Sequence, residues 1–143
     1  MKLVLQRVSR ASVKVAGIEV SSIALGILIL IGIEKADTPA SVLEAASKVE
    51  RLRLFEDTEG KTNLSIHGVK GSILLVPQFT LAADLTKGAR PSFDSAESAA
   101  RAKELIAIFT AFLKEQDIEV REGKFGERME VELVNDGPAT YLI

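Results

Sequence analysis

The chain has 143 residues, 47% of them hydrophobic and 27% charged, which is typical of one globular domain and excludes a disordered or low-complexity protein. It contains no cysteine, so disulfides and thiolate metal sites are excluded, and a reducing compartment is expected. The formal net charge of −2 counts against non-specific nucleic-acid binding, which usually needs a basic excess, but it allows a local basic patch.

The amino terminus lacks the long apolar core of a signal peptide. The most apolar run, residues 23–33, is shorter than the roughly 20 residues that cross a bilayer. Gly26 and Gly32 interrupt this run, so a buried strand is the better interpretation. We therefore expect a cytoplasmic protein with neither a membrane nor DNA as a partner.

The first predicted strand covers residues 3–15, and its odd positions form the apolar face. Arg7 lies on this face, so its side chain is expected to point inward among apolar neighbours. A turn at 16–17 leads to a short strand at 18–20. Residues 27–33 are nearly all aliphatic, which predicts a strand that is buried on both faces.

Thr38 and Pro39 predict a helix start, because a capping hydroxyl precedes a proline at the first helical position. Apolar residues then recur at helical spacing. Extended segments are predicted near 53–57 and 63–66, followed by an aliphatic strand at 72–76.

Asp94 and Glu97 resemble a capping box, which predicts that the longest helix covers about 95–115. Its predicted core face consists of Ala102, Leu105, Ile106, Phe109, Phe112 and Leu113. Strands near 118–122 and 128–134 follow. The order of elements favours a single α/β domain over the whole chain, 1–143, in which a mainly antiparallel or mixed sheet curls toward a barrel and two helices pack outside.

Ordinary catalytic groups are scarce. His67 is the only histidine and lies in a turn signal, so it cannot build a multi-histidine metal site and is interpreted as an exposed turn residue. The sequence has no phosphate-binding glycine loop and no dinucleotide fingerprint. We therefore predict a site that uses neither a metal nor a cofactor.

Two segments stand out. In residues 76–81, Pro77 removes a backbone donor after four aliphatic residues, and polar Gln78 and Thr80 follow where core residues are expected. This segment is either a strand end with two edge side chains or a rim that presents N–H groups and side chains to a ligand. The second segment, 135–140, has the composition of a simple turn.

Six patches, in order along the whole chain, carry a family resemblance. Two of them read Pro77-Gln78-Phe79-Thr80-Leu81 and Asn135-Asp136-Gly137-Pro138-Ala139-Thr140. The other four are Leu5-Gln6-Arg7-Val8, Ala11-Ser12-Val13, Gly60-Lys61-x-Asn63-Leu64 and Lys87-Gly88-x-Arg90-Pro91-Ser92-Phe93. Together they resemble the D-aminoacyl-tRNA deacylases, whose hallmarks are a Ser-Gln-Phe-Thr-Leu motif and an Asn-x-Gly-Pro-Val-Thr motif.

The resemblance implies a homodimeric carboxylic ester hydrolase that frees tRNA from D-amino acids. Gln78, Phe79 and Thr80 would line the catalytic pocket, and Pro77 and Leu81 would belong to the substrate site. An aminoacyl ester is already activated, so orientation, oxyanion stabilisation and the neighbouring ribose hydroxyl would supply the acceleration. The alternative, Thr80 as a covalent nucleophile, lacks an identifiable base in the sequence.

The resemblance also implies how chirality is judged. Gly137–Pro138 would adopt a cis bond, enter the partner's active site and reject L-amino acids sterically, while Arg7 would hold this motif. From their place in the polar loop 82–92, Lys87 and Arg90 are either contacts for the acceptor end of the aminoacyl-tRNA or solvated loop charges.

Glycine offers no chirality to reject, so glycyl-tRNA is an expected additional substrate of the family. Two departures from the family pattern concern selectivity: Pro77 replaces serine, and Ala139 replaces valine. They leave open a relaxed selection against L-amino acids. Pro77 also leaves open a dimeric module that binds aminoacyl-tRNA without turnover.

Overall fold

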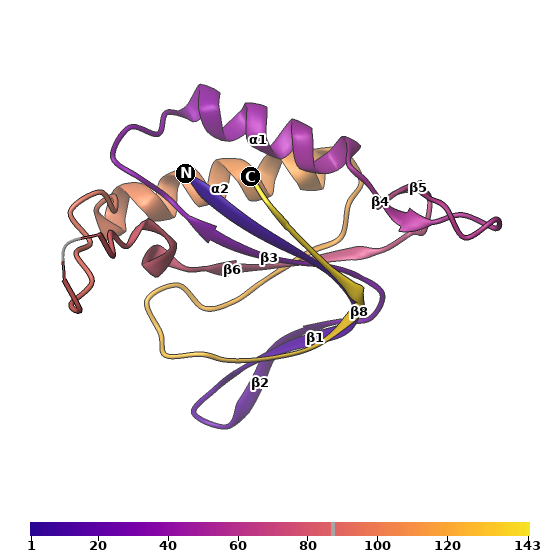
Figure 1. Ribbon diagram of the computed structural model, residues 1–143, viewed down its shortest axis with the longest axis horizontal. Helices are drawn as coiled ribbons and strands as arrows, with labels where there is room; N and C mark the ends of the chain where they lie inside the picture. The colour runs from indigo at the N-terminus through magenta and orange to yellow at the C-terminus, as the bar shows by residue number, and fades with distance from the viewer. Residues whose placement is uncertain (87) are drawn as a thin grey trace.

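The computed structural model describes residues 1–86 and 88–143, and within them six strands form one mixed sheet (Figure 1). The longest strands are β1 (Lys2–Val15) and β8 (Glu130–Leu142), which pair antiparallel. Along its other edge β1 pairs antiparallel with β2 (Ile18–Ile23) and β3 (Gly26–Gly32). Parallel pairing then adds β6 (Ser72–Pro77) to β3 and β7 (Val120–Glu122) to β6. Because three strands share β1, the sheet curls toward a barrel, as predicted.

Two helices, α1 (Pro39–Arg51) and α2 (Ala99–Glu115), lie side by side over one face of this sheet (Figure 1). α1 begins where the sequence predicts, because Thr38 and Ser41 exchange side-chain-to-backbone hydrogen bonds of 3.0 and 3.2 Å in a capping box. The main core lies between the helices and the sheet and includes Leu5, Ile29, Val49, Ile73, Leu105 and Phe109.

The predicted pattern of β1 is confirmed in part. Leu5 is buried under the helices, and Arg7 is buried as predicted, with 7% of its surface exposed. The pairing of β1 with β8 shifts register on both sides of Val8. The alternation therefore changes there, and Val8 joins Ala11 and Val13 in a second hydrophobic cluster. The prediction that the odd positions form one buried face along the whole strand was therefore wrong.

The predicted start of the longest helix at residue 95 was also wrong. The Ser95 carbonyl accepts a hydrogen bond from Lys35 N–H (3.0 Å), and Glu97 N–H donates to the Ile33 carbonyl (3.0 Å). These bonds tie the segment to the chain that follows β3, so the Asp94–Glu97 capping box does not form and α2 begins only after this crossing.

The remaining elements are short. β4 (Arg53–Glu56) and β5 (Thr62–Ser65) form an antiparallel hairpin, and η1 (Phe79–Ala82) is a single turn of 3₁₀ helix after β6. β8 continues through residues 135–140, where the composition suggested a simple turn. Among the described residues, no helix has the length and apolar character needed to cross a membrane.

Candidate active site

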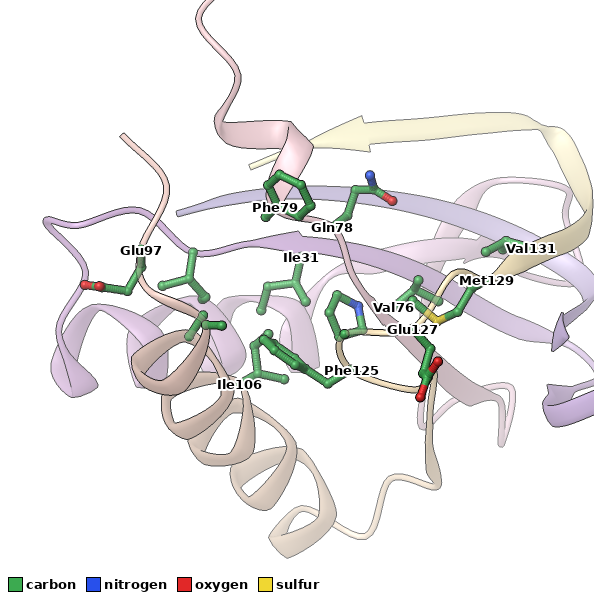
Figure 2. A pocket seen from close by; sticks show the side chains of 15 residues that line it. Ile31, Val76, Gln78, Phe79, Glu97, Ile106, Phe125, Glu127, Met129 and Val131 are labelled. Carbon is green, nitrogen blue, oxygen red and sulfur yellow. The ribbon is translucent and has the colours of Figure 1, made fainter. Parts of the chain in front are cut away.

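A cavity of about 500 Å³ lies where the parallel strands β3 and β6 end (Figure 2). Four segments surround it: the end of β3, the end of β6 with the start of η1, the first turns of α2, and the connection between β7 and β8 with the start of β8. The lining residues are Ile31, Ile33, Val76, Pro77, Gln78, Phe79, Glu97, Ala99, Ala102, Ile106, Phe125, Gly126, Glu127, Met129 and Val131. A mostly apolar recess beyond the carboxyl ends of parallel strands is a common place for a ligand site.

Gly32 allows the segment that leads into η1 to pack closely against the end of β3. A Cβ atom on Gly32 would lie 2.8 Å from the Gln78 carbonyl oxygen and 2.9 Å from the Leu81 Cβ, closer than a Cβ atom approaches non-bonded atoms in folded proteins. Leu81 thus packs against the backbone of β3 and is not among the residues that line the cavity, so its place in a substrate site stays a prediction.

The turn into η1, whose residue Phe79 lines the cavity, leaves two main-chain donors without a partner in the described part of the chain. Gln78 N–H is used in the sheet, where it donates to the Ile31 carbonyl (2.7 Å), and Leu81 N–H donates to the Gln78 carbonyl (3.1 Å). The N–H groups of Phe79 and Thr80 lie between these two bonds. Like the first amides of any helix they have no partner within the turn, and no described residue accepts from them.

The side chains of this segment diverge. Thr80 lies outside the cavity lining, is exposed, and accepts a hydrogen bond through its hydroxyl from the Gln78 side-chain amide. Phe79 is 60% exposed and meets Phe93 edge to face, with ring centroids 5.2 Å apart. Figure 2 shows Gln78 and Phe79 across the cavity from Phe125.

Pro77 affects the cavity rather than the sheet. It pairs with Ile31 at the end of β6, and Gln78 N–H points to β3. Because successive N–H groups of a strand point to opposite edges, an N–H at residue 77 would point away from β3. β7 pairs only with residues 73–75 of β6, so this edge is free of a strand there and belongs to the cavity. Proline therefore removes a donor from the cavity rim.

The loop after η1 carries the residues expected to meet tRNA. Asp84 and Ser92 pair through two backbone hydrogen bonds of 2.8 and 3.0 Å, which close the loop. Hydrogen bonds from the Thr86 hydroxyl and N–H lower the pKa of the Asp84 carboxyl. Arg90 is exposed on this loop, and Lys87 lies outside the described residues.

Gly137 and Pro138 lie apart from the cavity that their own chain forms. They are exposed on β8, and the peptide bond between them is cis. Asn135 spans the segment: its side-chain oxygen accepts from Ala139 N–H (2.7 Å), and its amide nitrogen donates to the Thr140 hydroxyl (3.1 Å). Asn135 was part of the recognised motif but was not among the predicted site residues.

Arg7 binds the backbone of the segment 135–140 through its guanidinium. Its Nε donates to the Asp136 carbonyl (2.8 Å), and its Nη1 donates to the Leu54 carbonyl (2.8 Å). The carboxylates of Glu56 and Asp136 lie 3.5 and 3.8 Å from the guanidinium. A buried cation needs such partners, because leaving it unpaired would be costly.

Several cavity residues escaped the sequence prediction. Met129 and Val131 were expected only as a strand face, and Phe125 and Glu127 lie in a connection without a periodic pattern. His67 is exposed and lies 3.3 Å from Glu50, away from the cavity. No group of three or more metal-ligating side chains occurs within the described part of the chain.

Comparisons with known proteins agree on one family. A family model described as D-Tyr-tRNA(Tyr) deacylase matches residues 4–143. Proteins named D-aminoacyl-tRNA deacylase from Geobacter sulfurreducens, Dictyoglomus turgidum and Azotobacter vinelandii are 48%, 47% and 46% identical over the whole chain, which covers 94%, 92% and 99% of their lengths.

Two solved structures have the same fold. One, described as a c-Myc DNA unwinding element binding protein, superposes with a TM-score of 0.94 at 38% sequence identity. The alignment covers 100% of this chain and 97% of that protein's chain. The other, described as a probable eukaryotic D-amino acid tRNA deacylase, superposes with a TM-score of 0.84 at 17% identity, covering 99% and 97%.

Proposed function

Because the chain belongs to the D-Tyr-tRNA(Tyr) deacylase family, we propose that it hydrolyses the ester bond between a D-amino acid and tRNA. The observation that carries the proposal is the cavity at the end of β6, which Phe79 lines, together with the neighbouring amides of Phe79 and Thr80, which have no partner among the described residues. Preorganised N–H groups of this kind stabilise the oxyanion that forms when an ester carbonyl is attacked.

The proposed reaction needs no nucleophile from the protein. Water adds to the ester carbonyl carbon, the bond to the ribose oxygen breaks, and the departing ribose oxygen takes up a proton. The neighbouring ribose hydroxyl assists this proton transfer, and the cavity supplies orientation. Thr80 as a covalent nucleophile ranks second, because its hydroxyl is bonded to the Gln78 amide, which is not a base.

Chirality is proposed to be judged by Gly137 and Pro138 in the active site of a partner subunit. Two observations support this. Both residues are exposed and lie outside the cavity of their own chain. The same strand also exposes apolar side chains, with Leu142 79% and Tyr141 36% exposed, as expected of a surface that another subunit covers.

Glycyl-tRNA is proposed as an additional substrate, because a filter that rejects an L side chain has nothing to reject in glycine. The proposed setting is the cytoplasm, where aminoacyl-tRNA is made. A DNA partner is not proposed for this chain, because the matching family and relatives are named for tRNA.

One observation favours a second candidate, a dimeric module that binds aminoacyl-tRNA without hydrolysing it. Pro77 removes an N–H from the cavity rim, and a lost donor at an oxyanion site typically costs about 10²–10³ in rate. We rank this candidate below the hydrolase, because the amides of Phe79 and Thr80 remain.

The test is deacylation of matched D-tyrosyl-, L-tyrosyl- and glycyl-tRNA by the purified protein in the presence of EDTA. We expect loss of the D-tyrosyl and glycyl esters while the L-tyrosyl ester is spared. Hydrolysis of the L ester as well would mean that selection is relaxed. Binding of all three without hydrolysis would favour the second candidate.

A further inference from the structure

One terminal nitrogen of Arg7 touches two parts of the molecule at once. Nη2 lies 3.5 Å from a carboxylate oxygen of Glu56, at the end of β4. The same Nη2 lies 3.0 Å from the position that a Cβ on Gly137 would occupy, so this nitrogen faces that glycine. Arg7 thus connects the β4–β5 hairpin with the Gly137–Pro138 segment.

The guanidinium is planar and rigid, so Nη2 moves only together with Nε and Nη1. Nε and Nη1 are held by the Asp136 and Leu54 carbonyls, both at 2.8 Å. Among the described residues, only the carboxylates of Glu56 and Asp136 lie within 4 Å of Arg7, and Glu56 is the one that faces Nη2. The Glu56 carboxylate therefore adds a third restraint on the guanidinium, at the nitrogen that faces Gly137.

The hairpin holds Glu56 in place. Glu56 pairs with Thr62 across the hairpin. The next residue, Asp57, accepts hydrogen bonds from Glu59 N–H (2.9 Å), Lys61 N–H (3.0 Å) and the Asn63 side chain (3.2 Å), which closes the turn. A carboxylate at this position is thus presented by an ordered element rather than by a free loop.

We infer that Glu56 is a positioning residue for chiral selection, which acts through Arg7 on Gly137 and Pro138. This inference rests on the proposed function of the Gly137–Pro138 segment. Glu56 itself touches no substrate in this role. Its 57% exposed side chain limits the size of its effect, because solvent screens such pairs.

The experiment compares Glu56→Ala and Glu56→Gln with the control Glu59→Ala. Glu59 lies on the same hairpin and forms an exposed 2.7 Å pair with Lys61, away from Arg7. The measured quantity is the ratio of kcat/KM for D-tyrosyl-tRNA to that for L-tyrosyl-tRNA. We expect Glu56→Ala to lower this ratio about two- to fivefold, the range of an exposed ion pair. We expect a smaller fall in Glu56→Gln, which keeps an acceptor oxygen, and no change in the control.

A structural readout separates this inference from the proposed function. The ¹H–¹⁵N resonances of Arg7 Nε and Gly137 N–H should shift in Glu56→Ala and not in Glu59→Ala, whether or not the protein hydrolyses an ester. Absence of any D-ester hydrolysis by the wild type, with these shifts present, would refute the proposed function and leave the coupling established. Unmoved resonances, or equal falls of the ratio in both alanine variants, would overturn the role of Glu56.

Discussion

Replacing Gly137 by alanine gives the sharpest prediction, because the structure fixes both the strain and its location. Gly137 has φ +140°, a conformation that residues with a Cβ rarely adopt and that costs roughly 1–3 kcal/mol. The added Cβ would also lie 2.9 Å from Ala139 N and 3.0 Å from Arg7 Nη2. We therefore expect Gly137→Ala to lower the free energy of unfolding by an amount at the upper end of that range.

The same substitution should change selectivity, because the added Cβ fits only if the Gly137–Pro138 segment or the Arg7 guanidinium moves. The assays are urea unfolding and the ratio of hydrolysis rates for D- and L-tyrosyl-tRNA. Gly17→Ala is the matched control: Gly17 has φ +77°, but nothing lies within 4 Å of the added Cβ. This control should cost only about 1 kcal/mol and leave the ratio unchanged. If Gly137→Ala destabilised no more than the control and kept the wild-type ratio, the reasoning would be refuted.

Three further predictions follow from the contacts described above. Arg7→Lys should lower the free energy of unfolding by about 1–3 kcal/mol in urea titrations, because at least one buried carbonyl loses its donor; an unchanged midpoint would contradict this. Pro77→Ser, which restores an N–H to the cavity rim, should speed D-tyrosyl-tRNA hydrolysis in single-turnover assays, and a slower variant would show that the rim donor is not used. Hydrogen bonds from the N–H groups of Lys61 and then Glu59 lower the pKa of the Asp57 carboxyl below its usual 3.8. The contribution of this carboxylate to the stability of the folded state is therefore present above pH 3.8 and is lost as the pH falls through the lowered value. Amide exchange of this turn should therefore accelerate only in acid, whereas an equal acceleration in Asp57→Asn would argue against the carboxylate.

Local patterns predicted much of the fold. The Thr38–Pro39 start of α1 and the buried position of Arg7 are confirmed, because a capping box and a strand alternation depend on neighbouring residues alone. The start of α2 was wrong for the opposite reason. The backbone before Ala99 forms hydrogen bonds with the segment that follows β3. A local sequence pattern does not indicate a hydrogen-bond partner that is distant in the sequence.

The candidate site divides in the same way. By itself, the sequence determined the family, because the motifs occur in the same order along the chain. It also indicated the segments 77–81 and 135–140 as the candidate functional segments. Only the tertiary structure decided that Phe125 and Met129 complete the cavity and that Gly137 lies outside it. Motifs record which residues are present, whereas a cavity and a shared guanidinium depend on strands and loops distant in sequence meeting in space.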